Sequence, residues 1–157
     1  MPFLPKRILV GTDFSEGSHQ AADAAVSLAK LTGASVTLVH AIPLGTYVDL
    51  ADASLRSHRE LNEMVGERVK SQLAAEVSRI RWDGGDVQSL TVDGPAAQEM
   101  ARVAGERQCD LVVVGSHGRT GLQRVLMGSV AEGTVRHSPA SVLIIRTHSL
   151  HEQPGQM

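Results

Sequence analysis

Two glycine-containing segments in the second half of the sequence have residue types that bind an anion through the main chain. Gly115-Ser116-His117-Gly118 follows an apolar run, and Gly128-Ser129-Val130 comes after a further nine residues. Glycine lets a ligand approach the backbone closely, and it permits the positive φ angles that aim successive N–H groups into one concavity. A helix that begins near Gly128 would add unpaired N–H donors and a partial positive charge. The two segments together predict a site for phosphate groups.

Two side chains fit the same interpretation. The Ser129 hydroxyl can donate one more hydrogen bond to a phosphate, and Arg119 can add a positive charge from the loop between the segments. Each feature also has a simpler explanation: glycines after strands are often only turn residues, Ser129 can serve only as a helix N-cap, and Arg119 can be a plain solvated charge. The spacing is neither that of a Walker loop nor that of a dinucleotide-binding G-x-G-x-x-G segment.

Three further candidates come at the ends of the first two apolar runs. Thr12 and Asp13 follow the first run, and Ala41 follows the second. In an open parallel sheet, ligands bind beyond the carboxyl ends of the strands, where the strand order reverses. We therefore expect these residues at the same edge of the sheet as the glycine segments. Asp13 has a second explanation, because an aspartate before a helix is a common N-cap.

The elements that must position these residues are short strands alternating with helices. The first, fourth and fifth apolar runs are almost continuously apolar, which is typical of strands buried on both faces, whereas polar residues in the third favour an edge position. Such alternation predicts an α/β sandwich with a parallel sheet and right-handed crossovers. The five runs that predict strands are Ile8–Val10, Val36–Val39, Val87–Val92, Leu111–Val114 and Val142–Ile145.

Helices are expected between the strands. Ser15 is a candidate N-cap for the first helix and Gly33 its candidate stop. The second helix has apolar residues at i, i+4 over 61–77. Gly94-Pro95 opens the third, with the proline at the first helical position, and the fourth is expected over about 129–136.

The chain is expected to form one domain over residues 1–147, followed by a flexible tail over 148–157, with fraying from Thr147 onward. The stretch 43–57 is expected to be a loop. Met64 and Met100 occupy apolar helical positions and are expected in the core. Three histidines straddle the last strand and the tail, and they are expected to be solvated rather than to bind a metal: His137, His148 and His151.

Composition excludes several classes of protein. The 157 residues suffice for one core without disulfides or metals, and a formal net charge of −2 offers no basic patch to nucleic acid. Cys109 is the only cysteine and is expected to be a small core residue rather than a redox centre. No apolar run is long enough to span a membrane. We therefore expect a cytoplasmic protein with neither nucleic acid nor a membrane as partner.

The combination of motifs resembles the ATP-binding branch of the universal stress protein family, with its adenine nucleotide alpha hydrolase-like fold. Besides the two glycine segments, the resemblance rests on the first strand and turn (Ile8–Ser15), the start of the third helix (Val92–Pro95) and the closing strand (Ser138–Ile145), and it spans residues 6–146. It implies a Rossmann-like, three-layer α/β sandwich whose five-stranded parallel sheet has the order 3-2-1-4-5. Gly11 and Gly121 depart from the commonest family residues without removing an expected contact.

The resemblance also implies roles for the candidate residues. Asp13 and Gly115 would lie near a ribose, with Asp13 also near a metal, and Ala41 would offer backbone hydrogen bonds to adenine. The implied ligand is ATP, with Mg²⁺, and the implied assembly is a homodimer through the fifth strand, whose edge would otherwise be exposed. The expected nucleotide contacts are Thr12, Asp13, Ala41, Gly115, His117, Gly118, Arg119, Gly128, Ser129 and Val130.

These expectations favour a nucleotide-dependent stress-response or signalling module over a fast enzyme, because the sequence has no Walker lysine. No catalytic residue is assigned. Two alternatives stay open. One is a slow ATPase, or a protein that phosphorylates itself at Ser116, Thr120 or Ser129. The other is a partner-binding module that binds no nucleotide.

Overall fold

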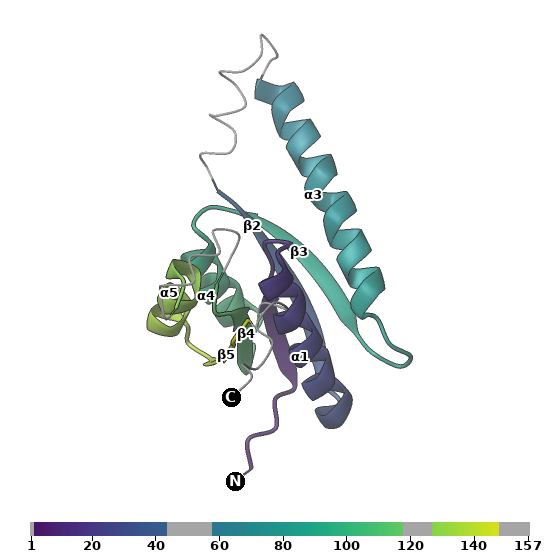
Figure 1. Cartoon of the computed structure of the whole chain (residues 1–157), viewed down its shortest axis with the longest axis vertical. Helices are drawn as coiled ribbons and strands as arrows, with labels where there is room; N and C mark the ends of the chain where they lie inside the picture. The colour runs from purple at the N-terminus through teal and green to yellow at the C-terminus, as the bar shows by residue number, and fades with distance from the viewer. Residues whose placement is uncertain (1, 44–57, 118–126, 148–157) are drawn as a thin grey trace, which may run out of the picture.

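The computed structural model describes residues 2–43, 58–117 and 127–147, which form strands alternating with helices (Figure 1). Every predicted strand and helix is confirmed. Most of the predicted loop 43–57 and the predicted tail 148–157 lie outside the described residues. The elements are β1 (Arg7–Gly11), α1 (Glu16–Thr32), β2 (Ser35–Ile42), α3 (His58–Ile80), β3 (Val87–Asp93), α4 (Ala96–Glu106), β4 (Leu111–Gly115), α5 (Ser129–His137) and β5 (Ser141–Ile145).

The strands form one parallel sheet, as the alternation of elements predicts, and its order β3-β2-β1-β4-β5 is the one that the family resemblance implies. The central strand is β1, where Leu9 lies between Thr37 of β2 and Val112 of β4. The predicted edge position of β3 is confirmed. The prediction that β5 is buried on both faces is wrong. Residues 142–145 are only half-buried, because β5 forms the other edge and no strand of this sheet covers its outer side.

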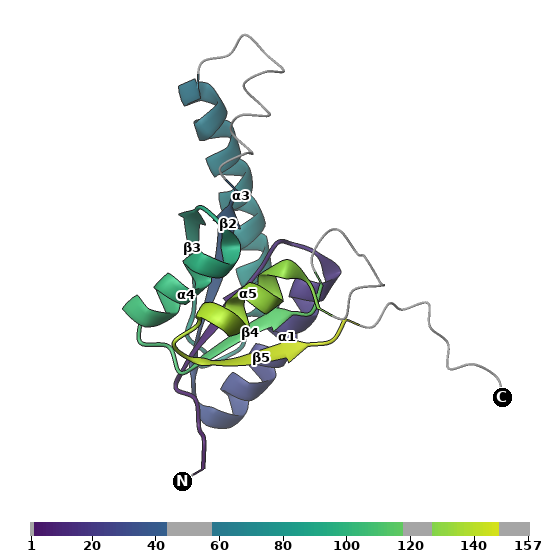
Figure 2. The same ribbon diagram turned by 90° about the vertical axis from the view of Figure 1, so that its left-hand side faces the viewer.

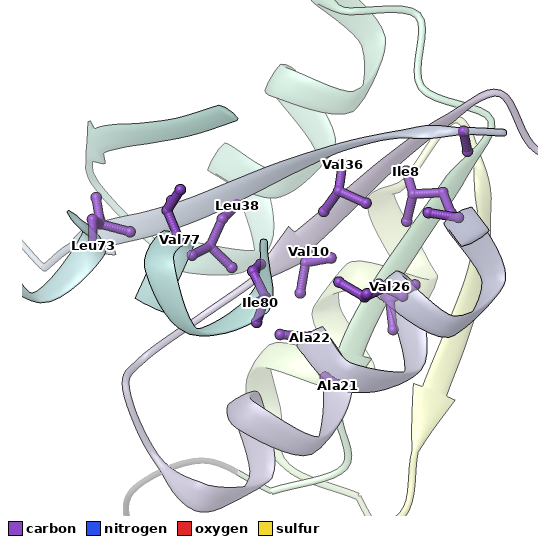
Figure 3. Packing of buried hydrophobic residues seen from close by; sticks show 14 of the residues in the cluster. Ile8, Val10, Ala21, Ala22, Val26, Val36, Leu38, Leu73, Val77 and Ile80 are labelled. Carbon is purple, nitrogen blue, oxygen red and sulfur yellow. The ribbon is translucent and has the colours of Figure 1, made fainter. Parts of the chain in front are cut away.

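Helices cover both faces of the sheet, with α1 and α3 on one face and α4 and α5 on the other (Figures 1 and 2). The pleat sends alternate residues of β1 into different cores. Ile8 and Val10 pack with α1 and α3, whereas Leu9 packs with α4 and α5. Figure 3 shows the first of these cores, in which α1 presents small side chains such as Ala21 and Ala22 toward the sheet. These small side chains let α1 approach the strands closely.

The helix ends agree with most of the predicted signals. Ser15 is the N-cap of α1, and Gly33 ends α1 in the left-handed conformation at φ 74°. Pro95 is the N-cap of α4 rather than its first helical residue, so that prediction is wrong by one position. Gly128 is the N-cap of α5, and Ser129 is the first helical residue. The alternative in which Ser129 is itself the cap is therefore wrong.

Four predictions about single residues have different outcomes. Met100 is buried at 2 % exposure, as predicted, but Met64 is 53 % exposed because the first turns of α3 extend past the strands (Figure 1). Cys109 is half-buried against the α4–α5 core. Thr147 is not frayed, since its N–H donates to Ser116 Oγ at 3.2 Å. Within the described ranges, no helix has the length and apolar character needed to cross a bilayer.

Candidate functional site

The two glycine segments meet at the carboxyl end of β4. The Gly128 N–H donates to the Ser116 carbonyl oxygen at 2.6 Å, so the start of α5 is tied directly to the turn after β4. The Ser116 N–H donates in turn to the Ile145 carbonyl oxygen of β5 at 2.8 Å. The fold therefore brings Gly115, Ser116 and Gly128 into one neighbourhood, as the phosphate-site prediction requires.

The start of α5 has N–H groups that its own N-cap cannot satisfy. An α-helix leaves its first N–H groups without partners inside the helix. In α1 a side chain supplies an acceptor, since Ser15 Oγ accepts from the Ser18 N–H at 3.3 Å. Gly128 has no side chain to offer, and Ser129 and Val130 are exposed. The exposed Ser129 hydroxyl and the first N–H groups of α5 can therefore donate hydrogen bonds to an anion.

Asp13 lies in the turn between β1 and α1. Its Oδ1 accepts from the Ser15 N–H at 3.0 Å and from the Ser15 hydroxyl. Asp13 is therefore not the N-cap of α1, and the simple capping explanation for it is wrong. It instead supports the capping serine, and this pair of bonds fixes the carboxylate at the edge of the sheet beside the end of β1.

Gly115 and Gly17 are required by packing. A Cβ atom on Gly115 would lie 2.9 Å from the Gly17 carbonyl oxygen, and one on Gly17 would lie 2.8 Å from the His117 carbonyl oxygen. Cβ atoms essentially never approach so closely, so both glycines are needed for the first turn of α1 to rest on the turn after β4. The role of Gly17 was not predicted. The expected contact of Gly115 with a ribose remains a prediction.

Ala41 lies where β2 runs on past the end of β1. The ladder between these strands ends with the Thr12 N–H donating to the Val39 carbonyl oxygen at 2.8 Å. In a parallel ladder, alternate residues direct both backbone groups to the same neighbour. Val39 bonds toward β1, and Ile42 bonds toward β3 by accepting from the Gly94 N–H at 3.0 Å. Ala41 therefore directs its N–H and C=O toward the β1 side, beyond the last paired residue.

Two side chains that the sequence analysis gave no role, His40 and Phe14, organise the turn beside Ala41 together with Thr12. His40 Nδ1 lies 2.8 Å from the Thr12 carbonyl oxygen, and its ring stacks on Phe14 with centroids 4.6 Å apart. Phe14 has φ 63°, which is unusual for a residue with a side chain. The Thr12 hydroxyl accepts from the Phe14 N–H at 3.1 Å and lies 3.1 Å from Ser18 Oγ. The sequence offers two signals of this arrangement: an aromatic residue directly after Asp13 and a histidine at the end of a strand.

Ser116 is a poor candidate for self-phosphorylation. Its side chain is 3 % exposed, its Oγ lies 3.0 Å from His117 Nδ1, and the same oxygen accepts from the Thr147 N–H. Of the other two hydroxyl candidates, Ser129 is exposed and Thr120 lies outside the described residues.

The remaining predicted contacts divide into two groups. Gly118 and Arg119 lie outside the described residues, whereas His117 and Val130 flank the junction between the β4 turn and α5.

Over residues 2–43, 58–117 and 127–147, no three histidine, cysteine, aspartate or glutamate side chains gather closely enough to hold a metal ion. A hollow of about 460 Å³, whose lining includes Lys6, Lys30 and Trp82, lies at the amino end of β2 and contains none of the predicted contacts.

Comparison with known proteins agrees with the resemblance in the sequence. The model of the universal stress protein family matches residues 5–146. Universal stress protein MJ0531 of Methanocaldococcus jannaschii is 31 % identical over 144 residues, which cover 91 % of this chain and 83 % of that protein.

Solved structures of universal stress proteins share the fold. The structure of MJ0577, a universal stress protein of Methanocaldococcus jannaschii, superposes with a TM-score of 0.81 at 26 % identity, over 94 % of this chain and 99 % of the other. A universal stress protein in complex with cAMP superposes with a TM-score of 0.67 at 25 % identity, over 92 % of this chain and 98 % of the other.

Proposed function

This chain belongs to the universal stress protein family, and from that premise we propose that it is a nucleotide-dependent stress-response module which binds ATP, with Mg²⁺, at the carboxyl end of its sheet. The observation that carries the proposal is the 2.6 Å hydrogen bond from the Gly128 N–H to the Ser116 carbonyl oxygen, which joins the two glycine segments. The solved complex of a related stress protein with cAMP supports an adenine nucleotide as the ligand.

The phosphate groups are assigned to the start of α5 and the turn after β4. Gly128 leaves room for an oxygen beside the uncapped N–H groups of the first turn, and the positive end of the helix dipole favours negative charge there. The exposed Ser129 hydroxyl adds a donor. The proposed phosphate contacts are His117, Gly118, Arg119, Gly128, Ser129 and Val130.

The nucleoside is assigned to the ends of β1, β2 and β4. The N–H and C=O of Ala41 face the β1 side and form a donor–acceptor pair suited to adenine. Thr12 and Gly115 flank the ribose. Asp13 supplies a carboxylate, the ligand type that Mg²⁺ takes together with phosphate oxygens and water, and its Oδ1 is already oriented by Ser15. Bound Mg²⁺ would neutralise phosphate charge in the complex.

Binding is proposed in preference to chemistry. The burial of Ser116 at 3 % exposure disfavours one of the three hydroxyl groups that a self-phosphorylating protein would use. Nucleotide occupancy would then act through the surface of the protein, and the proposed surface is a homodimer interface along β5. In support, β5 is an edge strand whose apolar residues 142–145 are half-buried, and the neighbouring α5 exposes Val130 and Val135 at 43 % and 50 %.

The proposal is tested by isothermal titration of the full chain with ATP and Mg²⁺, comparing wild type with Gly128→Val. Gly128 has φ −70° and ψ 161°, which valine adopts without strain, so the variant should fold and yet crowd the phosphates. We expect affinity to fall by about tenfold or more, or roughly 1.4 kcal/mol.

A matched control is Pro95→Val, which changes another N-cap without a side-chain hydrogen bond, in a similar backbone conformation at the start of α4. This variant should bind ATP as wild type does. Equal affinity of wild type and Gly128→Val would refute the assignment of the phosphates, and absence of ATP binding by wild type would refute the proposed function.

A further inference from the structure

The ladder between β1 and β2 stops one step before Ala41, where the groups that would continue it make other contacts. If the ladder continued in register, the Ala41 N–H would donate to the Thr12 carbonyl oxygen and the Ala41 C=O would accept from the Phe14 N–H. Both partners are engaged elsewhere. The Thr12 carbonyl oxygen lies 2.8 Å from His40 Nδ1, and the Phe14 N–H donates to the Thr12 hydroxyl at 3.1 Å.

We propose that His40 is a positioning residue of the nucleotide site: by occupying the Thr12 carbonyl and stacking on Phe14, it ends the β1–β2 ladder and keeps the backbone edge of Ala41 open for a purine. This inference rests on the proposed function, and it adds the device that makes the purine edge available. His40 acts through the turn and is not itself assigned a contact with the nucleotide.

The geometry fixes which ring nitrogen carries a proton. A carbonyl oxygen only accepts hydrogen bonds, so Nδ1 of His40 is the donor in the 2.8 Å contact. The ring must therefore hold its Nδ1 proton in the state that supports the turn. This requirement distinguishes His40 from a histidine that only fills space.

Phe14 shows that the turn is held away from its relaxed conformation. Its φ of 63° lies in the left-handed region, which residues with a side chain adopt only when their surroundings impose it. The surroundings here are the His40 ring, at a centroid distance of 4.6 Å, and the Thr12 hydroxyl. Asp13 directly precedes Phe14, so the same turn carries the Asp13 carboxylate, whose Oδ1 accepts from the Ser15 N–H.

Two substitutions separate the hydrogen bond from the stacking. His40→Asn keeps an N–H donor close to the place of Nδ1 but removes the ring, and His40→Phe keeps a ring but removes the donor. Titration calorimetry of wild type and both variants with ATP and Mg²⁺ gives the affinities, and thermal unfolding of the same apo samples gives their stabilities. We expect His40→Phe to lose about tenfold or more in affinity, whereas His40→Asn stays within about threefold of wild type.

If His40 had a merely structural role, the loss of ATP affinity would parallel the fall in unfolding temperature across the variants. The asparagine variant would then have no advantage in affinity over the phenylalanine variant. If wild type binds ATP and His40→Phe binds it within twofold, the positioning role is wrong while the proposed function stands. If wild type binds no adenine nucleotide, both the positioning role of His40 and the proposed function are wrong. Nitrogen NMR of the histidine rings in the apo protein gives an independent result: a protonated Nδ1 in slow exchange supports the inference, and an unprotonated Nδ1 overturns it.

Discussion

At the scale of single residues, Glu76 shows how this fold accommodates a charge that is almost fully buried. Its side chain is 4 % exposed, and its Oε1 lies 2.9 Å from His19 Nδ1 and accepts from Arg79 at 2.7 Å. Arg79 also reaches Asp23 of α1 at 2.7 Å. Burying a carboxylate is costly unless it is paired and hydrogen-bonded, so these contacts explain how α3 can bring Glu76 against α1.

Glu76→Gln is predicted to destabilise the protein by about 2 kcal/mol, because it removes a charge that accepts bonds from Arg79 and His19 in a buried setting. Glu63→Gln is the matched control on the same helix. Glu63 pairs with Arg59 at 3.2 Å, but both side chains are well exposed, so its loss should cost less than about 0.5 kcal/mol. Urea unfolding at neutral pH measures both values, and equal costs would contradict the account of Glu76.

The same carboxylate predicts a pH dependence. Burial alone raises the pKa of Glu76, but hydrogen bonds from Arg79 and His19 outweigh it and hold the pKa below its ordinary value of 4.5. The stabilisation is therefore complete above about pH 4.5 and is lost as pH falls through the lower folded-state pKa. The stability difference between wild type and Glu76→Gln should shrink on acidification through this range, and a difference that grows would show that the sign is wrong.

At the scale of elements, replacing two exposed glycines with alanine should change stability in opposite directions. At both positions an added Cβ atom would meet open space within 4 Å. Gly33 ends α1 at φ 74°, where a Cβ atom is strained, so Gly33→Ala should destabilise by about 1 kcal/mol. Gly66 lies within α3, where alanine is the better helix former, so Gly66→Ala should stabilise by about 1 kcal/mol. Thermal unfolding of the pair measures both, and a shared sign would contradict the assigned helix ends.

The strands and helices could be predicted because their signals are local. Continuous apolar runs, an i, i+4 pattern and a glycine stop all act within a few residues of one another. Met64 was misplaced because helical periodicity does not reveal that the first turns of α3 extend past the strands. The role of His40 could not be predicted, since it depends on the exact residue at which β1 turns away from β2, and no local pattern records that register.

At the scale of the whole molecule, the meeting of the two glycine segments was predictable in outline and not in detail. Alternating strands and helices indicate a parallel sheet, but the order β3-β2-β1-β4-β5 came from the family resemblance, because strand order depends on contacts distant in sequence. The need for glycine at 17 depends on the contact between α1 and the turn after β4, which no local pattern records. Contacts between elements decide such features, and a single sequence does not show them.

The proposed homodimer has a direct test at the free edge. The Ser116 N–H donates to Ile145, so backbone groups of Ile145 and Leu143 face β4 while those of Val142 and Ile144 face outward. Val142→Pro removes an outward N–H and spares the ladder to β4. Sedimentation should give a dimer for wild type and a monomer for Val142→Pro, with folding of the variant checked by circular dichroism. A monomeric wild type, or a folded variant that remains dimeric, would contradict the interface.

The central claim is that an adenine nucleotide binds at the carboxyl end of the sheet, and backbone amide NMR during titration with ATP and Mg²⁺ tests it most directly. The account predicts that the largest shift changes fall on Asp13, Ala41, the turn after β4 and the first turn of α5. Amides around Lys6, Lys30 and Trp82, at the opposite end, should stay unchanged. Shift changes concentrated at that opposite end, or none anywhere at saturating ATP, would contradict the claim.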